Sequence, residues 1–213
     1  MEIKVHDIVR FEAMSDIENT IDQPGWVKDA PTAKNFGVVR RMPITDKIVP
    51  IGLRGNKREQ RYGAFIHERN IIQVISPISL VGRVERLADR LYFPALLSIK
   101  EEFKKYKLAW GPTGSVGFEI ATSIQATTPS SDIDICLYLN EIETELLVKL
   151  GNFLDGLDRR IDVQVELPSI GAFLLNDYLK YNKTGFIVRT KFGPHLSTIE
   201  NNRIKLGVSS EIG

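Results

Sequence analysis

The stretch Gly114-Ser115-Val116-Gly117 is followed further along the chain by Ser131-Asp132-Ile133-Asp134. The second stretch continues as an apolar run that has the composition of a β-strand. Side chains two positions apart on a strand point to the same face of its sheet. Asp132 and Asp134 are therefore expected to project together, while Ile133 and Ile135 face apolar packing on the other side.

A third carboxylate lies on a second predicted strand, Ile161-Asp162-Val163-Gln164-Val165. Neighbouring carboxylates repel one another and are costly to bury unless they share a cation. Mg²⁺ prefers oxygen ligands, and three carboxylates can hold two such ions about 3.5–4 Å apart. We therefore predict a site for Mg²⁺, with two ions, formed by Asp132, Asp134 and Asp162.

The Gly114-Ser115 pair predicts a phosphate-binding turn. Glycine allows a phosphate to approach the backbone closely, and a helix that begins here would direct its free N–H groups at phosphate oxygens. An isolated Asp-x-Asp usually caps a turn or faces solvent, and an isolated Gly-Ser is weaker still. Here the Gly-Ser pair precedes the Asp-x-Asp, the Asp-x-Asp lies on a predicted strand, and Asp162 lies on a later one. This combination indicates a nucleotidyltransferase.

The bulk composition excludes several classes of protein. The 213 residues carry 28 basic and 27 acidic side chains, so we expect neither nucleic acid nor a membrane as a partner. The single cysteine, Cys136, excludes an internal disulfide, and its apolar neighbours predict a buried structural thiol. The first residues contain no apolar signal segment, and no apolar run approaches the roughly 18 residues of a membrane helix, which favours the cytoplasm.

The periodicity of apolar residues differs between the two halves of the chain, which predicts two domains. The predicted fold class is α/β (α+β). Residues 1–80 hold short β-like runs separated by turn residues, which predicts a small β-rich domain that includes a basic segment. Residues 81–213 alternate between helix and strand patterns, which predicts a nucleotidyltransferase-like mixed sheet flanked by helices. The predicted elements of this half are helices at 84–93, 94–106, 142–157 and 169–179, and strands at 108–110, 132–139, 160–167 and 186–191. Asn140 and Glu143 resemble a capping box before the third helix.

Residues 40–61 carry seven basic and two acidic side chains. Such a run is often a solvated edge strand, where charge discourages unwanted strand pairing. Alternatively, it forms an electropositive wall for a triphosphate or a docking surface for an acidic carrier protein. Arg54, Arg58 and Arg61 are the best candidates, since arginine makes bidentate contacts with phosphate. Arg54 is expected in a tight turn between Gly52 and Gly55.

The stretches 114–122 and 131–134 resemble the core of the phosphoribosyl-dephospho-CoA transferases, also called malonate decarboxylase holo-acyl-carrier-protein synthases. The resemblance extends over nearly the whole chain. It includes His6-Asp7-Ile8-Val9, Val39-Arg40-Arg41, Pro50-Ile51-Gly52-Leu53-Arg54-Gly55, Arg58 with Gln60-Arg61, Gly171-Ala172, Arg189-Thr190 and Gly193-Pro194. The chain departs from the family at Asn176, where an acidic residue is expected.

The resemblance implies transfer of a phosphoribosyl-dephospho-CoA group from 2′-(5″-triphosphoribosyl)-3′-dephospho-CoA to a serine of the acyl-carrier subunit of malonate decarboxylase, with release of pyrophosphate. It implies Asp132 and Asp134 as bridging metal ligands. Asp162 would be a ligand on the nucleophile side and a candidate general base. Gly114 and Ser115 would hold the pyrophosphate portion.

Two alternatives stay open at this point. The same site would serve transfer from ATP or another nucleotide to a different acceptor. The chain would also suit a non-catalytic module that binds a carrier protein, although the presence of all three carboxylates argues against a decayed site. The sequence does not distinguish the carrier of malonate decarboxylase from that of citrate lyase.

Overall fold

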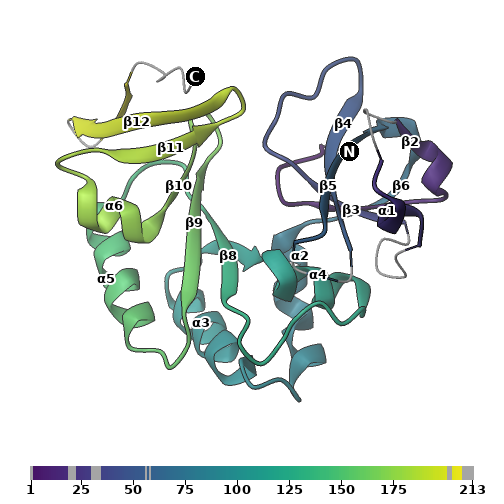
Figure 1. Ribbon diagram of the computed structural model, residues 1–213. Helices are drawn as coiled ribbons and strands as arrows, with labels where there is room; N and C mark the ends of the chain where they lie inside the picture. Colours follow the sequence, from purple (N-terminus) through teal and green to yellow (C-terminus); the bar gives the residue numbers. More distant parts are fainter. Residues whose placement is uncertain are drawn as a thin grey trace.

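The computed structural model describes residues 2–18, 23–29, 35–55, 57, 59–200 and 203–207. Two β-sheets built from the two halves of the chain lie side by side, with helices around the second sheet (Figure 1). The predicted α+β class is confirmed. The domain boundary at residue 80 stays a prediction.

The N-terminal sheet has the strand order β2-β5-β4-β3-β1-β6, and its paired strands are antiparallel. Its strands are β1 (Ile8–Phe11), β2 (Ile17–Glu18), β3 (Phe36–Val39), β4 (Ile48–Arg54), β5 (Arg61–His67) and β6 (Ile71–Ile75). Short helical segments connect them: η1 (Met14–Asp16), α1 (Gly25–Asp29) and η3 (Glu68–Asn70). Residues 48–54 form strand β4 because apolar side chains occupy every second position. Val49, Ile51 and Leu53 point to the same face of the sheet and are at most 1% exposed.

The C-terminal sheet has the order β13-β12-β11-β10-β9-β8-β7. Its strands are β7 (Ala109–Pro112), β8 (Ile133–Tyr138), β9 (Ile161–Leu167), β10 (Gly171–Leu174), β11 (Phe186–Thr190), β12 (Gly193–Glu200) and β13 (Arg203–Leu206). Strands β8 and β9 are parallel, whereas the other neighbours are antiparallel. A parallel pair requires a crossover, which helix α5 (Thr144–Asp155) supplies.

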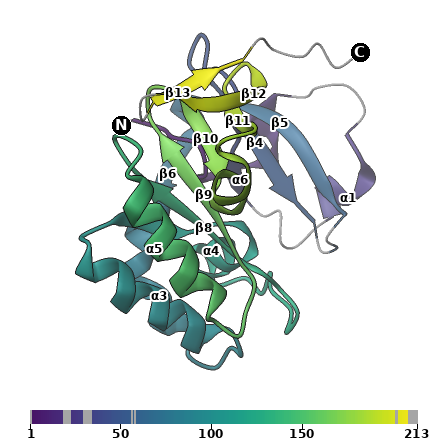
Figure 2. The same cartoon turned by 90° about the vertical axis from the view of Figure 1, so that its left-hand side faces the viewer.

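The remaining helices are α2 (Pro77–Leu80), η4 (Val81–Leu87), α3 (Phe93–Lys105), α4 (Gly114–Thr122) and α6 (Leu175–Tyr181). Helices α3, α5 and α6 gather on one side of the C-terminal sheet (Figure 2). Ile133, Ile135 and Leu137 of β8 are fully buried in the core that includes Leu147 and Leu150 of α5. The alternate residues of β8 therefore face away from these helices. No helix within the described ranges combines the length and apolar character needed to cross a bilayer.

Several local predictions were wrong. Residues 81–87 form a 3-10 helix, the N-cap of α5 is Glu143 rather than Asn140, and Arg54 ends strand β4 instead of lying in a turn. The segment 171–174 was expected within a helix but is strand β10, because it pairs with β9 in a hairpin. Strands β1, β2, β12 and β13 were not predicted. Pairing with distant neighbours stabilises these segments, and short-range patterns carry no information about such pairing.

Candidate active site

Asp134 of β8 and Asp162 of β9 are direct cross-strand partners. Neighbouring strands lie about 4.8 Å apart, so the two side chains leave the same face of the sheet next to each other. Asp132 immediately precedes β8, and its charge acts on Asp134, which places it near this pair. The structure thus brings the three predicted carboxylates together.

The electrostatics of this group fit a cation. Burial raises the pKa of Asp134, and the charges of Asp162 and Asp132 raise it further. Arg160 lies 3.3 Å from Asp162 Oδ1 through its Nε atom, but its side chain is 70% exposed. An ion pair that exposed is screened by water and compensates little of the negative charge. A divalent ion would supply the missing positive charge.

Helix α4 begins against these carboxylates. Its first residue, Gly114, has a φ of 57°, and a β-carbon on it would come within 2.0 Å of Asp134 Oδ2. The N–H of Thr113 also donates to the carbonyl oxygen of Asp134, at 2.8 Å. Only glycine combines this backbone conformation with this approach. The N-terminal turn of α4, which contains the partly exposed Ser115, therefore lies beside Asp134.

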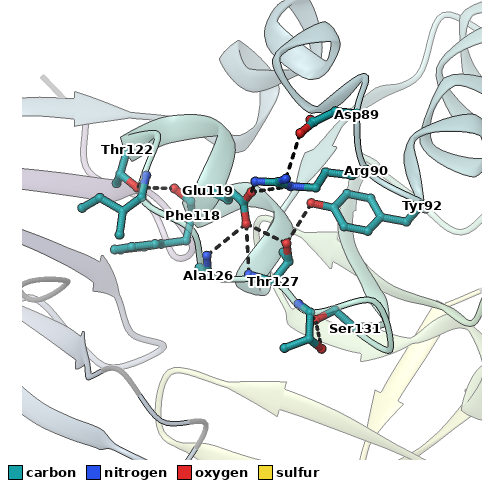
Figure 3. A network of polar contacts seen from close by, with 11 residues as sticks. Asp89, Arg90, Tyr92, Phe118, Glu119, Thr122, Ala126, Thr127 and Ser131 are labelled. Carbon is teal, nitrogen blue, oxygen red and sulfur yellow. Dashed lines mark hydrogen bonds and ion pairs between the residues drawn. The ribbon is translucent and has the colours of Figure 1, made fainter.

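A buried carboxylate fixes the segment that joins α4 to β8 (Figure 3). Glu119 is 3% exposed and accepts hydrogen bonds at Oε2 from the backbone N–H groups of Ala126 and Thr127, both at 3.0 Å, and from Thr127 Oγ1 at 2.6 Å. Its Oε1 atom accepts from Arg90 Nη2 at 2.7 Å and Nε at 2.9 Å. Burial alone would raise the pKa of Glu119, but these hydrogen bonds outweigh burial and lower it. Glu119 stays ionised and anchors the segment that leads to Asp132.

A cavity of about 810 Å³ lies between the two halves of the chain. Gly114, Asp134 and Asp162 line it from the C-terminal half, and Arg54 and Arg61 line it from β4 and β5. Two predicted residues, Ser115 and Asp132, are not among the described residues that line this cavity. Arg58 lies outside the described residues.

Arg54 connects β4 to the C-terminal half of the chain. Its Nη2 donates to the carbonyl oxygen of Ala126 at 2.7 Å, in the segment that Glu119 anchors. Burial and the nearby charge of Arg61 lower the pKa of Arg54 to about 10, while Glu119 and Asp134 act in the opposite direction. Arg54 stays protonated at neutral pH and faces the carboxylate group. The cavity therefore has an acidic wall and a basic wall.

A second polar cluster, which was not predicted from the sequence, adjoins the carboxylates. Glu166 of β9 is ion-paired with Arg41, and its Oε1 lies 3.3 Å from His6 Nε2 and 2.7 Å from Gln164 Nε2. Gln164 and Glu166 continue the i, i+2 row that starts at Asp162, which is the signal that predicts their face. Burial raises the pKa of Glu166, but the hydrogen bond from His6 and the charge of Arg41 outweigh it and lower the pKa. This cluster joins the N-terminal half to the strand that carries Asp162.

Cys136 borders this cluster. It is fully buried, as predicted, and burial raises its pKa. The sulfur of Cys136, a ring nitrogen of His6 and a carboxylate oxygen of Glu166 all lie within 4.8 Å of one another. Arg41 is already ion-paired with the carboxylate of Glu166, so this group packs the N-terminal half against β9.

Comparison with known proteins assigns the chain to a family. Residues 4–77 match the family model for the phosphoribosyl-dephospho-CoA transferase MdcG N-terminal domain, and residues 79–200 match the model for the MdcG C-terminal domain. No solved structure matches significantly.

Curated relatives agree with the family models. A phosphoribosyl-dephospho-CoA transferase of Klebsiella pneumoniae is 33% identical over 195 residues, which cover 90% of this chain and 93% of the relative. A Pseudomonas putida enzyme of the same name is 32% identical over 192 residues, covering 90% and 91%. One from Azotobacter vinelandii is 32% identical over 160 residues, covering 73% and 75%. The chain therefore belongs to the phosphoribosyl-dephospho-CoA transferase family and is a transferase enzyme.

Proposed function

We propose that this enzyme transfers the phosphoribosyl-dephospho-CoA group from 2′-(5″-triphosphoribosyl)-3′-dephospho-CoA to a serine of the apo acyl-carrier subunit of malonate decarboxylase, releasing pyrophosphate. The observation that carries the proposal is the cross-strand pair Asp134 and Asp162, which faces Arg54 and Arg61 across one cavity. A polyphosphate donor needs this combination, because its anionic oxygens require both cations and basic side chains.

Asp132, Asp134 and Asp162 fit Mg²⁺, since their oxygens suit a hard cation and the pKa of Asp134 is raised first by burial and then by the charges of Asp162 and Asp132. When bound there, one or two Mg²⁺ ions would neutralise charge on the transferring phosphate and polarise the attacking hydroxyl. The carboxylates themselves hold the ions at the cavity wall next to Gly114.

The side chains of the enzyme would divide the remaining tasks. Arg54 and Arg61 offset the charge of the triphosphate, and the N–H groups at the start of α4 donate to the pyrophosphate portion. The serine Oγ of the carrier forms a bond to the α-phosphorus as the bond from that phosphorus to pyrophosphate breaks. Asp162, on the same face, accepts the hydroxyl proton and returns it to solvent.

Mass spectrometry of the apo carrier incubated with the donor and Mg²⁺ tests the proposal. We expect the carrier to gain the mass of one phosphoribosyl-dephospho-CoA group with the native enzyme and with Asp158→Asn, which alters an exposed acid. With Asp134→Asn we expect almost no gain, because an amide does not supply an anionic ligand.

Other outcomes would contradict the proposal. An equal gain with Asp134→Asn would remove the carboxylates from the mechanism. Modification of the citrate lyase carrier instead, or label transfer from ATP in place of the named donor, would identify a different acceptor or donor.

A further inference from the structure

The face of the C-terminal sheet that carries Asp162 continues beyond the cavity. On β9 and β10, Glu166 is the cross-strand partner of Ala172, and Ala172 is in turn the partner of Arg189 on β11. Cross-strand partners point to the same side of a sheet, so Arg189 shares the face of Asp162. Arg189 also lines the cavity. Strand β11 thus extends the catalytic face outward from the site.

Past Arg189 this face is apolar and open. Ile187 and Leu196 are cross-strand partners on β11 and β12, and they are 40% and 55% exposed. The residues that alternate with Ile187, Phe186 and Val188, are at most 2% exposed in the core on the other side. Phe192, at the tip of the β11–β12 hairpin, is 88% exposed. Monomeric proteins seldom expose several large apolar side chains together unless the patch has a partner.

Basic side chains surround the apolar ones. Thr198, which shares the face of Leu196, is the cross-strand partner of Lys205 on β13. Arg189 and Lys205 lie on this face, Lys191 lies at the hairpin tip, and β13 also contributes Arg203. The described residues 186–200 and 203–207 contain these four Lys and Arg residues against one acid, Glu200, which Lys205 contacts at 3.0 Å. We call this surface the β11–β13 face.

We propose that the β11–β13 face is the docking surface for the acceptor, an acidic carrier protein that packs apolar side chains against Ile187, Leu196 and Phe192. This inference rests on the proposed function. A folded acceptor is too large for a cavity of about 810 Å³, so its serine has to reach the carboxylates from a surface that borders the cavity. The face borders the cavity at Arg189, and its positive charge complements an acidic partner. Arg40, Arg41, Arg54 and Arg61 line the cavity from the N-terminal half and are assigned to the donor, whereas Arg189 lies where the cavity meets the β11–β13 face.

Steady-state transfer kinetics test the docking surface with the apo acyl-carrier subunit of malonate decarboxylase as the varied substrate. Leu196→Asp places a charge in the apolar centre and opposes an acidic partner. We expect the KM for the carrier to rise about tenfold or more, with kcat at saturating carrier and the Kd for the donor unchanged. The matched control is Ile72→Asp, which changes a strand residue that is 52% exposed on β6 of the other sheet and should leave all three values unchanged. An unchanged KM in Leu196→Asp overturns the docking surface.

Hydrogen exchange of the native enzyme provides a measurement that does not depend on folding of a variant. Adding apo carrier should slow amide exchange within residues 186–200 and leave β6 unaffected. Protection confined to another surface overturns the proposal. If the native enzyme transfers nothing to this carrier, the proposed function fails. Transfer without protection of residues 186–200 rejects the docking surface alone.

Discussion

Asp134 and Asp162 are cross-strand partners on adjacent parallel strands, and both line the cavity between the two halves of the chain. Burial raises the pKa of Asp134, and repulsion by the charges of Asp162 and Asp132 raises it further, so the ionised pair destabilises the folded protein. We therefore expect stability to depend on metal binding, because a cation would relieve this repulsion.

Asp134→Asn should raise the thermal midpoint in the presence of EDTA, because it removes one of the repelling charges. The same change should abolish the increase in midpoint that Mg²⁺ produces in the native enzyme and lower transfer by at least about 100-fold. Differential scanning fluorimetry with and without Mg²⁺ measures both effects on stability. Asp158→Asn serves as the control, and a Mg²⁺-dependent increase that survives in Asp134→Asn would contradict a metal site at this carboxylate.

Gly114→Ala should destabilise the protein by about 2 kcal/mol or more, since alanine is strained at a φ of 57° and its β-carbon would overlap Asp134 Oδ2. Displacement of Asp134 should also weaken the response to Mg²⁺. Gly82→Ala is the matched control, because a β-carbon there meets no atom within 4 Å. Urea unfolding of both variants gives the comparison, and equal midpoints would show that the close approach is relaxed in solution.

Glu119→Gln should lower the free energy of unfolding by about 2 kcal/mol. Five hydrogen bonds are donated to the carboxylate of Glu119, which is 3% exposed. The amide of glutamine would direct its own N–H groups at some of these donors. Transfer should slow as well, since the segment leading to Asp132 loses its anchor. Glu101→Gln, on the exposed side of α3, is the control for urea unfolding and for activity. A native-like midpoint for Glu119→Gln would mean that the segment does not depend on this carboxylate.

Asp7 should make stability depend on pH. It is 3% exposed, and burial raises its pKa from 3.8 to about 6, although the Lys4 N–H donates to it at 2.8 Å. Between these two values the folded state keeps a proton that the unfolded state has lost. The contribution of Asp7 to the free energy of unfolding therefore falls by roughly 3 kcal/mol as pH rises from about 4 to about 6. Above that pH the contribution is constant.

The difference between the native enzyme and Asp7→Asn isolates this contribution from the other carboxylates. Relative to the native enzyme, Asp7→Asn should gain stability as pH rises through that window. Urea unfolding at pH 4 and pH 7 measures the difference, and a difference that does not change with pH would contradict the expected titration of Asp7.

Arg54→Ala should weaken binding of the donor by about tenfold or more, because a charge-assisted contact to phosphate is lost from the basic wall. Isothermal titration with the donor measures the effect, and Arg69→Ala, an exposed arginine of η3, is the control. Arg54 also donates a hydrogen bond to the carbonyl oxygen of Ala126. Arg54→Lys keeps the positive charge but not the guanidinium, so it separates the effect of the charge from that of the guanidinium geometry. Unchanged affinity in Arg54→Ala would remove this residue from the donor site.

The strands and helices nearest the site follow from local pattern. The alternation around Asp132, Ile133 and Asp134 predicted both a strand and the face of its carboxylates, and β8 and β9 lie within one residue of their expected bounds. Helix α4 begins at Gly114, which meets the condition set for phosphate binding at the Gly-Ser pair, although no helix was predicted there from periodicity. The hairpins β9–β10 and β11–β12 were missed in part because their stability comes from pairing between strands.

What the sequence determined by itself is which side chains share a face, because the two-residue period of a strand is a property of the local backbone. Tertiary structure decided that Asp134 is level with Asp162, since that register depends on the crossover through α5 and on burial of Ile135 and Val163. It also decided that His6, Arg41 and Arg54 meet the second half of the chain. Contacts between residues more than 70 positions apart arise from packing two sheets together, and no short-range period encodes them.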